Sequence, residues 1–322
     1  MYVHVGKTGG TTLDSILRSN CEWYWRSLYC WKAFHAQGEE TILSKLTLKT
    51  IHARPIEREE DLQFVEHNIT TFLFTVRNPI DRAISSFYFD HPDNIPSESK
   101  MTAYVREIFY KRCFPDMETL STVLGNYSTP HIISIPHFEN ETRVDEYDCF
   151  QNGKDVLEGI GEVVYNGHLR KNYDFYMKQT IDIFPWNEVF VVRTEEFEHD
   201  LKTLNAALYD AHATALNYTH KSSALDHMTK QTHGSETYKV KTNLYKKGKM
   251  VICCYLSKEN QIFENLVRSA SNLGMLEKDV YMNNLYDDCG IDNRELTRPI
   301  VGGENLLSFN WLRWRRQSSK CQ

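Results

Sequence analysis

The chain of 322 residues lacks several features that would assign it to a class at once. No apolar run approaches the roughly 20 residues that span a bilayer, and no signal peptide is present. There is no Pro-, Gly- or Ser-rich linker, no break in composition and no internal repeat. We therefore expect one domain over residues 1–322, although length alone would suggest about two.

Patterns that bind metals or polyanions are missing as well. The eight cysteines contain no C-x-x-C pair and no Cys/His spacing typical of zinc, so no metal site is expected. The net charge of −6 excludes a general polyanion binder, and we expect no nucleic-acid partner. An anionic substrate would need a local basic patch. The even number of cysteines permits disulfides, with Cys113 and Cys149 as one candidate pair among several connectivities.

The stretch HVGKTGGTTLDSIL at residues 4–17 predicts a strand, a tight turn and a helix. Gly9 and Gly10 let the backbone approach a ligand closely, and the first N–H groups of a helix have no partner within it. These groups and the helix dipole favour an anion, and Lys7 adds a positive charge. The stretch therefore predicts a phosphate-binding loop, with an ordinary glycine-containing connection as the alternative.

The nucleotide-binding P-loop, G-x-x-x-x-G-K-[ST], is the nearest general pattern. Gly6, Lys7 and Thr8 match its end, but its earlier glycine would fall on Met1. The glycines of this chain follow the lysine instead. A P-loop kinase is therefore the second interpretation of the stretch.

A second motif, TFLFTVRNPIDRAISSFYF, occupies residues 71–89. Its first six residues predict a strand, Arg77 follows the strand, and Pro79 suits the first turn of a helix. Ser85 comes eight residues after Arg77. A guanidinium group and a hydroxyl together suit a dianionic phosphate.

Further apolar strands are expected at residues 2–5, 45–53 and 188–193, and helices at residues 102–111, 117–124 and 155–183. Strands separated by helices predict an α/β fold with a central parallel sheet flanked by helices. Ligands in such sheets bind beyond the carboxyl ends of the strands, where both motifs lie.

Together the two motifs resemble those of sulfotransferases, in particular the Golgi carbohydrate type that includes the heparan sulfate 2-O- and 6-O-sulfotransferases. HVGKTGGTT is similar to the family's phosphosulfate loop, and the Arg77–Ser85 spacing is similar to its pair for the 3′-phosphate. Weaker similarity continues at residues 186–208 and 259–274. The resemblance implies a P-loop-like three-layer fold and the donor PAPS (3′-phosphoadenosine 5′-phosphosulfate), without a metal.

The resemblance also implies roles for individual residues. Lys7 would stabilise charge on the leaving phosphate, and Arg77 and Ser85 would hold the 3′-phosphate. The 5′ side would be held by backbone N–H groups and by hydroxyl groups of the loop, from Thr8, Gly9, Gly10, Thr11 and Thr12.

His52 resembles the catalytic base of the heparan sulfate enzymes, because it ends a predicted strand between the two motifs. Imidazole accepts a proton near neutral pH. His4 is the other candidate histidine, although its place inside the first strand favours a core position. Carboxylates at Glu57, Glu59 and Glu60 are reserve candidates, and they also fit a solvated helix start.

Four N-x-[ST] sequons, at Asn68, Asn126, Asn140 and Asn217, together with the resemblance, favour the lumen of the secretory pathway. We expect the full-length protein to be a type II membrane protein of the Golgi, with an anchor and stem preceding this sequence; a soluble protein is the alternative. The expected acceptor is a hydroxyl of a glycan or another compound, anionic ones included. A non-catalytic glycan-binding relative is a further alternative. Such a protein would tolerate loss of Lys7 or His52, and because both are present we favour an active enzyme.

Two polar segments have open interpretations. Residues 221–250 contain seven lysines and predict a surface loop or a flap over the donor or an anionic sugar. The tail WLRWRRQ, residues 311–317, is either a sugar contact or a packed amphipathic end.

Overall fold

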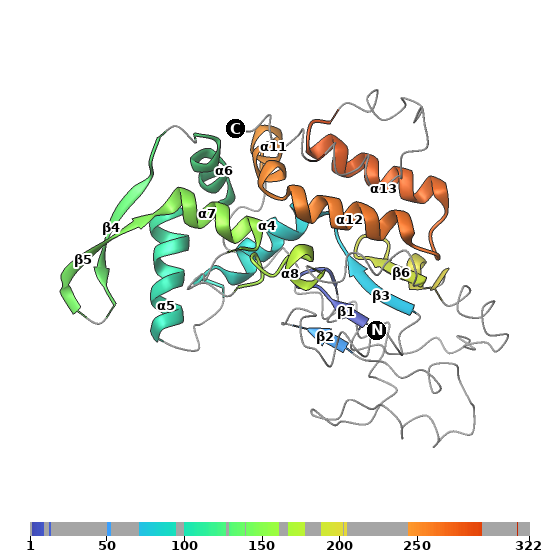
Figure 1. Cartoon of the computed structure of the whole chain (residues 1–322), viewed down its shortest axis with the longest axis horizontal. Helices are drawn as coiled ribbons and strands as arrows, with labels where there is room; N and C mark the ends of the chain where they lie inside the picture. Colours follow the sequence, from blue (N-terminus) through green and yellow to red (C-terminus); the bar gives the residue numbers. More distant parts are fainter. Residues whose placement is uncertain are drawn as a thin grey trace, which may run out of the picture. The chain divides into compact units, whose positions relative to one another are not determined.

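The computed structural model in Figure 1 describes residues 2–9, 13, 50–52, 71–94, 100–126, 129–138, 140–160, 167–177, 188–201, 203–204, 244–291 and 314. The chain forms two compact units, each built from separate segments. The first comprises Met1–Arg77, Tyr176–Gly234 and Leu266–Lys278, and the second comprises Asn78–Phe175, Ser235–Asn265 and Asp279–Gln322. The single domain over residues 1–322 stays a prediction. No helix among the described residues has the length and apolar character needed to span a membrane.

The first unit contains a parallel sheet, visible in Figure 1, with the strand order β2-β1-β3-β6. Its strands are β1 (Tyr2–His4), β2 (Thr50–His52), β3 (Thr71–Val76) and β6 (Glu188–Arg193). The last two have the predicted bounds, because near-continuous apolar runs are typical of strands buried on both faces. The α/β prediction with a parallel sheet is confirmed. For β2 the structure describes the final three residues of the predicted strand.

The strand order reverses direction at β1. The chain passes from β1 to β2 on one side and then to β3 on the other side of β1. In open parallel sheets a ligand crevice forms at such a reversal, beyond the carboxyl ends of the strands. The loop after β1 and Arg77 after β3 flank this point.

Residues that follow the helix α12 (Ser257–Ser269) cover the outer edge of β6. The Ser271 N–H donates to the Val189 carbonyl at 2.7 Å. The Asn272 side chain accepts from the Val191 N–H at 2.9 Å and donates to the Val191 carbonyl at 2.8 Å. Backbone groups that an edge strand would leave unpaired are satisfied in this way. A buried cluster of Tyr2, Leu13, Phe190, Val192 and Leu204 packs in the same unit.

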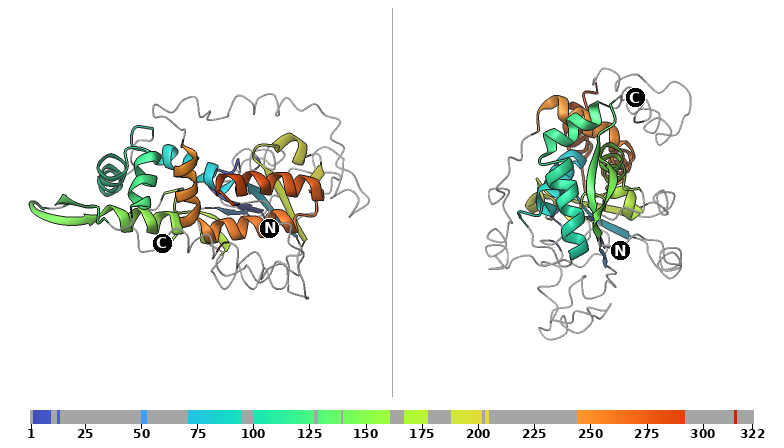
Figure 2. Two further views of the ribbon diagram at one scale, coloured as in Figure 1. Left: turned by 90° about the horizontal axis from the view of Figure 1, so that it is seen from above. Right: turned by 90° about the vertical axis from the view of Figure 1, so that its left-hand side faces the viewer.

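The described part of the second unit is mainly helical and includes a β-hairpin. Its helices are α4 (Pro79–Asp90), α5 (Lys100–Arg106), the π-helix η2 (Glu107–Cys113), α6 (Met117–Gly125), α7 (Cys149–Glu158) and α11 (Lys246–Tyr255); α8 (Tyr173–Met177), α12 and α13 (Met275–Asp288) contribute to both units. The hairpin strands β4 (Ile132–His137) and β5 (Asn140–Asp148) extend beyond α5 and α7 (Figure 2).

The second unit departs from the sequence analysis in three places. The hairpin was not expected, because its residues are mostly polar and at least partly exposed. The helix over residues 155–183 is interrupted: α7 ends at Glu158, where Gly159 has φ +68° and donates its N–H to the carbonyls of the preceding turn. Residues 246–250 belong to α11 rather than to the predicted loop. The helices at 102–111 and 117–124 are confirmed.

A fully buried ion pair lies inside the second unit. The Arg82 guanidinium group pairs with both Glu259 carboxylate oxygens, with Nη2 and Oε2 2.8 Å apart. Arg82 Nη1 also donates to the His168 carbonyl at 3.1 Å. Hydrogen bonds of this kind are needed when charge is removed from water. The pair joins α4 to α12.

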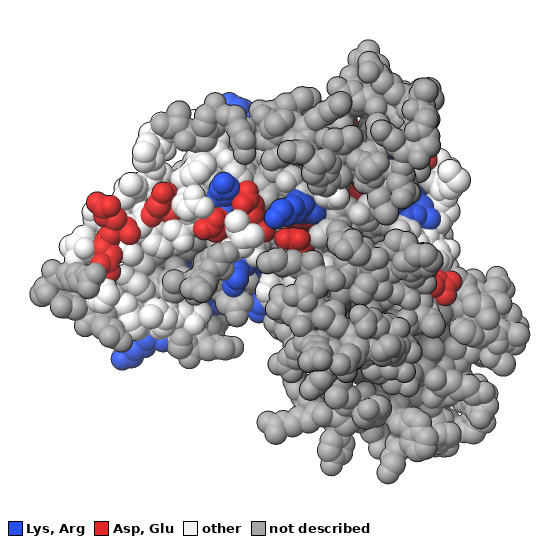
Figure 3. Space-filling view, viewed as in Figure 1, with Lys and Arg blue, Asp and Glu red and all other residues white. Residues whose placement is uncertain are grey.

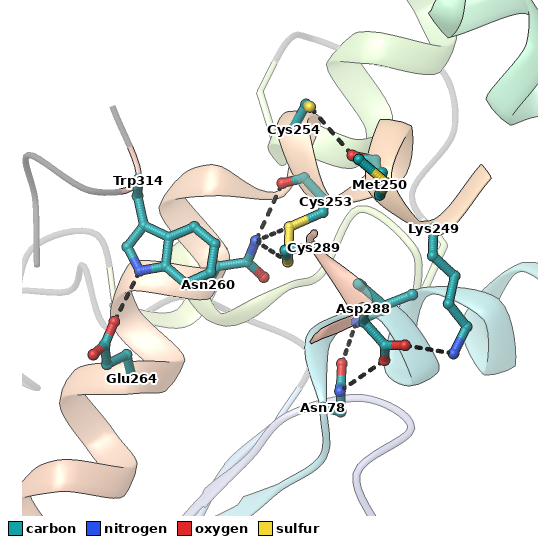
Figure 4. The surroundings of a disulfide bond; sticks show 11 residues. Asn78, Lys249, Met250, Cys253, Cys254, Asn260, Glu264, Asp288, Cys289 and Trp314 are labelled. Atoms are coloured by element: carbon teal, nitrogen blue, oxygen red, sulfur yellow. Dashed lines mark hydrogen bonds and ion pairs between the residues drawn. A yellow bond between two sulfur atoms is a disulfide. The ribbon is translucent and has the colours of Figure 1, made fainter. Parts of the chain in front are cut away.

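Among the described residues, two disulfides close loops in the same unit. The candidate pair Cys113–Cys149 is confirmed, and Cys253–Cys289 joins α11 to the end of α13 (Figure 4). Beside the second disulfide, the Trp314 indole N–H donates to the buried Glu264 carboxylate at 3.0 Å. Trp314 is itself buried, which confirms a packed end for the tail at this residue.

Candidate active site

The two predicted motifs meet at the carboxyl end of the sheet. The Thr8 and Thr75 hydroxyl oxygens are 2.8 Å apart, and Thr8 Oγ1 also donates to the Val5 carbonyl at 2.7 Å. A hydroxyl has one hydrogen, so Thr75 must be the donor to Thr8. Both side chains are fully buried. The loop after β1 is therefore hydrogen-bonded to Thr75, the penultimate residue of β3.

This hydrogen bond concerns the predicted role of the Thr8 hydroxyl. Its hydroxyl hydrogen is committed to the Val5 carbonyl and cannot also be donated to a phosphate. In this structure the Thr8 side chain therefore shapes the loop, and a hydrogen bond from its hydroxyl to a donor phosphate would require the bond to Val5 to break.

The loop has the backbone conformation of a ligand cradle. Lys7 has φ +65° and Gly9 has φ +75°. Residues other than glycine rarely adopt this left-handed backbone conformation. A β-carbon at Gly9 would also lie 3.4 Å from Thr194 Oγ1, after the end of β6. The Gly9 carbonyl accepts from the Leu13 N–H at 3.2 Å, as at the start of a helix. Gly10, Thr11 and Thr12 lie outside the described residues.

Arg77 lies at the same edge of the sheet, directly after β3. Its Nε is 3.8 Å from Glu195 Oε1, and the two side chains are 30% and 38% exposed. The Thr194 N–H and hydroxyl both donate to the Val76 carbonyl, at 2.8 and 3.0 Å. These bonds hold the chain after β6 against the chain after β3.

Ser85 lies on α4, which begins at Pro79 as predicted. The Asn78 side chain accepts from the Ile80 N–H at 3.0 Å and caps this helix. Ser85 is half-buried. Arg77 belongs to the first unit and Ser85 to the second, so each is described within its own unit.

The predicted base, His52, is the last residue of β2 and pairs in register with His4 of β1. The end of β2 therefore lies next to the beginning of the loop after β1. His4 is 7% exposed and stacks on Tyr2, with ring centroids 6.1 Å apart. This packing confirms the core interpretation of His4. Glu57, Glu59 and Glu60 lie outside the described residues.

An ion-pair network surrounds Arg193, the last residue of β6. Asp200 accepts from the Arg193 N–H, Nε and Nη2 at 2.7, 2.8 and 2.6 Å, and Glu277 accepts from Nη2 at 3.2 Å. Glu277 also accepts from the Gly274 N–H and lies 2.8 Å from His199 Nε2; the Gly274 bond is the main cause of its lowered pKa. Ligand atoms of His199, Asp200 and Glu277 lie within 4.8 Å of one another, but the guanidinium already supplies the positive charge. The cluster therefore fits an ion-pair network better than a metal site.

Three residues of this edge were missed by the sequence analysis: Thr75, Thr194 and Glu195. The sequence contains a signal for the last two, because the polar residues RTEE directly follow the apolar strand residues EVFVV. Every parallel strand places its next few residues at the same edge, so polar residues after β6 could have been added to the site.

A sulfotransferase family model matches residues 1–248, about three quarters of the chain. The chain therefore belongs to the sulfotransferase family. No curated protein and no solved structure matches it. The family, the parallel sheet and the joined motifs agree on a transferase that moves a sulfuryl group.

Proposed function

We propose that the protein transfers the sulfuryl group of PAPS to a hydroxyl of a carbohydrate, within a three-layer P-loop-like fold. The observation that carries the proposal is the Thr8–Thr75 hydrogen bond of 2.8 Å. It joins the loop of Lys7 and Gly9 to the end of β3, one residue from Val76 and two from Arg77. A donor with phosphate groups at both its 5′ and 3′ positions needs cations and N–H groups at two such sites.

The chemistry assigns a role to each predicted residue. The acceptor oxygen forms a bond to sulfur while the bond from sulfur to the bridging oxygen breaks, leaving PAP, the 3′,5′-bisphosphate. The acceptor proton passes to His52, and Lys7 stabilises charge on the leaving phosphate. The backbone of Gly9, Gly10, Thr11 and Thr12 holds the 5′ side, and Arg77 and Ser85 hold the 3′-phosphate.

The proposed acceptor is a glycan, and the proposed location is the Golgi lumen, with membrane attachment through a preceding anchor. Disulfides such as Cys113–Cys149 support an oxidising compartment. Basic and acidic side chains are interspersed among the described residues on the face in Figure 3. On this described part of the surface, an anionic glycan would therefore meet local cations and no broad basic field.

Calorimetry with PAP and with ATP–Mg²⁺ tests the donor directly. We expect PAP to bind, and binding to collapse in Arg77→Ala because a guanidinium partner of the 3′-phosphate is lost. Binding of ATP–Mg²⁺ without PAP would favour a P-loop kinase. Binding of PAP without sulfation of any glycan in an acceptor panel would favour a non-catalytic glycan-binding relative.

A further inference from the structure

The turn at residues 167–172, which precedes α8, is fixed to α4 through its backbone. The buried Asp90 carboxylate accepts from the His168 N–H at 2.6 Å and from the Leu169 N–H at 3.3 Å. Arg82 Nη1, earlier on α4, donates to the His168 carbonyl at 3.1 Å. One helix therefore holds both N–H groups and a carbonyl of the turn, and the turn is in place before a ligand binds.

Three of the four side chains at positions 168–171 are basic, those of His168, Arg170 and Lys171. All three residues are partly exposed. Asp90 is 1% exposed, and its Oδ1 lies 2.8 Å from His168 Nδ1 while its Oδ2 accepts from the backbone. This carboxylate is therefore engaged with His168 and with the backbone, and the turn presents basic side chains to solvent.

Lys171 has no counter-ion among the described residues. Its ammonium group forms neither an ion pair nor a hydrogen bond with them, and Asp90 and Arg170 are the charged groups that act on it from nearby. Burial is the main cause of its lowered pKa, which Asp90 opposes and Arg170 strengthens. By comparison, the Nζ atoms of Lys111 and Lys249 lie 3.2 and 2.8 Å from a carboxylate oxygen. A half-buried cation without a partner gains more from a bound anion than a paired cation does.

We infer that Lys171, with Arg170 beside it, binds an acidic group of the acceptor, and that this group is a uronic acid carboxylate of a glycan chain. The inference rests on the proposed function, since it needs a glycan acceptor. A glycan chain that awaits sulfation carries carboxylates as its acidic groups, and an ammonium group binds a carboxylate as a compact point charge.

The helix that holds this turn is also the helix of the proposed donor site. Ser85, the proposed ligand of the 3′-phosphate, follows Arg82 by three residues on α4. A glycan bound at Lys171 and a donor bound at Ser85 would therefore be positioned by the same helix. Transfer between two substrates depends on such positioning.

The test compares Lys171→Gln with Lys111→Gln by calorimetry. Lys111 is an exposed, paired lysine of the same unit, so its variant has the same change of charge. The probes are a hexasaccharide of alternating glucuronic acid and N-acetylglucosamine, the same hexasaccharide with its carboxyl groups reduced to alcohols, and PAP. An ion pair at a half-buried cation is worth a factor of about three to ten in a binding constant, so Lys171→Gln should bind the acidic hexasaccharide about three- to tenfold more weakly. Its affinities for the reduced hexasaccharide and for PAP, and all three affinities in Lys111→Gln, should stay close to wild type.

Two further measurements separate binding from folding. Lys171→Arg should keep most of the wild-type affinity for the acidic hexasaccharide, because it retains the charge. Lys171→Gln should melt no lower than wild type, since the charge that it removes has no partner in the described part of the fold. A clearly lower melting temperature would contradict this premise.

Four results would overturn the inference while leaving the donor site intact. They are no binding of the acidic hexasaccharide to the wild-type protein, unchanged binding in Lys171→Gln, an equal loss in Lys111→Gln, and an equal loss for the reduced hexasaccharide. Weaker PAP binding in Lys171→Gln with unchanged hexasaccharide binding would assign the cation to the donor instead. Failure of the wild-type protein to bind PAP is measured separately and would overturn the proposed function together with the inference.

Discussion

Thr8 and Thr75 share a hydrogen bond between two fully buried hydroxyl groups, although 67 residues separate them in the chain. The bond is directional, because Thr8 already donates to the Val5 carbonyl. Thr8 therefore donates to the Val5 carbonyl and accepts from the Thr75 hydroxyl.

The two threonines should respond differently to replacement by valine. Thr75→Val removes one hydrogen bond, worth about 1 kcal/mol, whereas Thr8→Val also leaves the Val5 carbonyl and the Thr75 hydroxyl without this partner, at about 1–3 kcal/mol. Denaturant unfolding measures both losses. The double variant should lose less than the sum of the single losses, and strict additivity would argue against the shared bond.

Lys7 and His52 should separate donor binding from chemistry. Lys7→Ala should lower kcat by roughly 10²-fold or more and weaken PAP binding, because a cation at the leaving phosphate is lost. His52→Ala should lower kcat by a similar factor with PAP affinity unchanged, because a base acts on the acceptor. Steady-state kinetics and PAP calorimetry give the two readouts. Normal turnover in a folded His52→Ala protein would remove His52 from the mechanism.

The Arg82–Glu259 pair should stabilise the second unit only as a pair. Arg82→Met leaves the fully buried Glu259 carboxylate without its guanidinium partner, and we expect a loss of about 3–5 kcal/mol in the free energy of unfolding. Arg82→Met combined with Glu259→Leu should recover part of that loss, because no unpaired charge remains. A double variant as unstable as both single losses combined would contradict this account.

Glu277 predicts a pH dependence of stability. Its pKa lies below the ordinary 4.5, first through the Gly274 N–H and also through His199 and Arg193. Its contribution is therefore complete above about pH 4.5 and is lost as the pH falls through the lower, folded-state pKa. Glu277→Gln should be less stable than wild type at pH 7, by no more than about 1 kcal/mol for a partly exposed group. Thermal melts from pH 7 to 3 should converge at the acidic end.

Asn126 offers a test of the proposed compartment. It is exposed at the end of α6, within a sequon, so the folded protein leaves room for a glycan. Secreted from eukaryotic cells, the protein should lose mass on treatment with peptide N-glycosidase, and Asn126→Gln should remove one glycan unit. Full occupancy of the other sequons with none at Asn126 would show that this site is not used.

The strands of the sheet could be predicted because buried strands consist mainly of consecutive apolar residues. β3 and β6 are apolar runs with predicted bounds, and they carry Arg77 and the missed Glu195 at their ends. The hairpin of β4 and β5 could not, since its strands bury little and β4 contains Pro136, where the pairing register shifts. Gly159 is a signal for the end of α7. The helical pattern on both sides of it nevertheless led to the prediction of one continuous helix.

Within the candidate site, the residues that we propose to act by their own chemistry were easier to select from the sequence than those that act through a partner. Lys7, Gly9 and Arg77 follow from loop composition and strand ends. The Thr75–Thr8 bond and the Arg77–Glu195 pair depend on which strands are neighbours, and periodicity does not specify strand order. The long separation of these partners in the chain explains why local patterns missed them.

Residues beyond 248, where the family-model match ends, limit where the chain can be truncated. The match to the family model ends there, yet Glu259, which neutralises Arg82, comes later in the chain. Ser271 and Asn272, which bind the outer edge of β6, also come later. A truncation after residue 248 would leave the buried Arg82 guanidinium without its carboxylate partner. It would also expose the outer edge of β6, and exposed strand edges promote aggregation. The stretch that the family model matches and the stretch that folding requires therefore end at different residues, and both cysteines of the Cys253–Cys289 disulfide lie beyond the matched stretch.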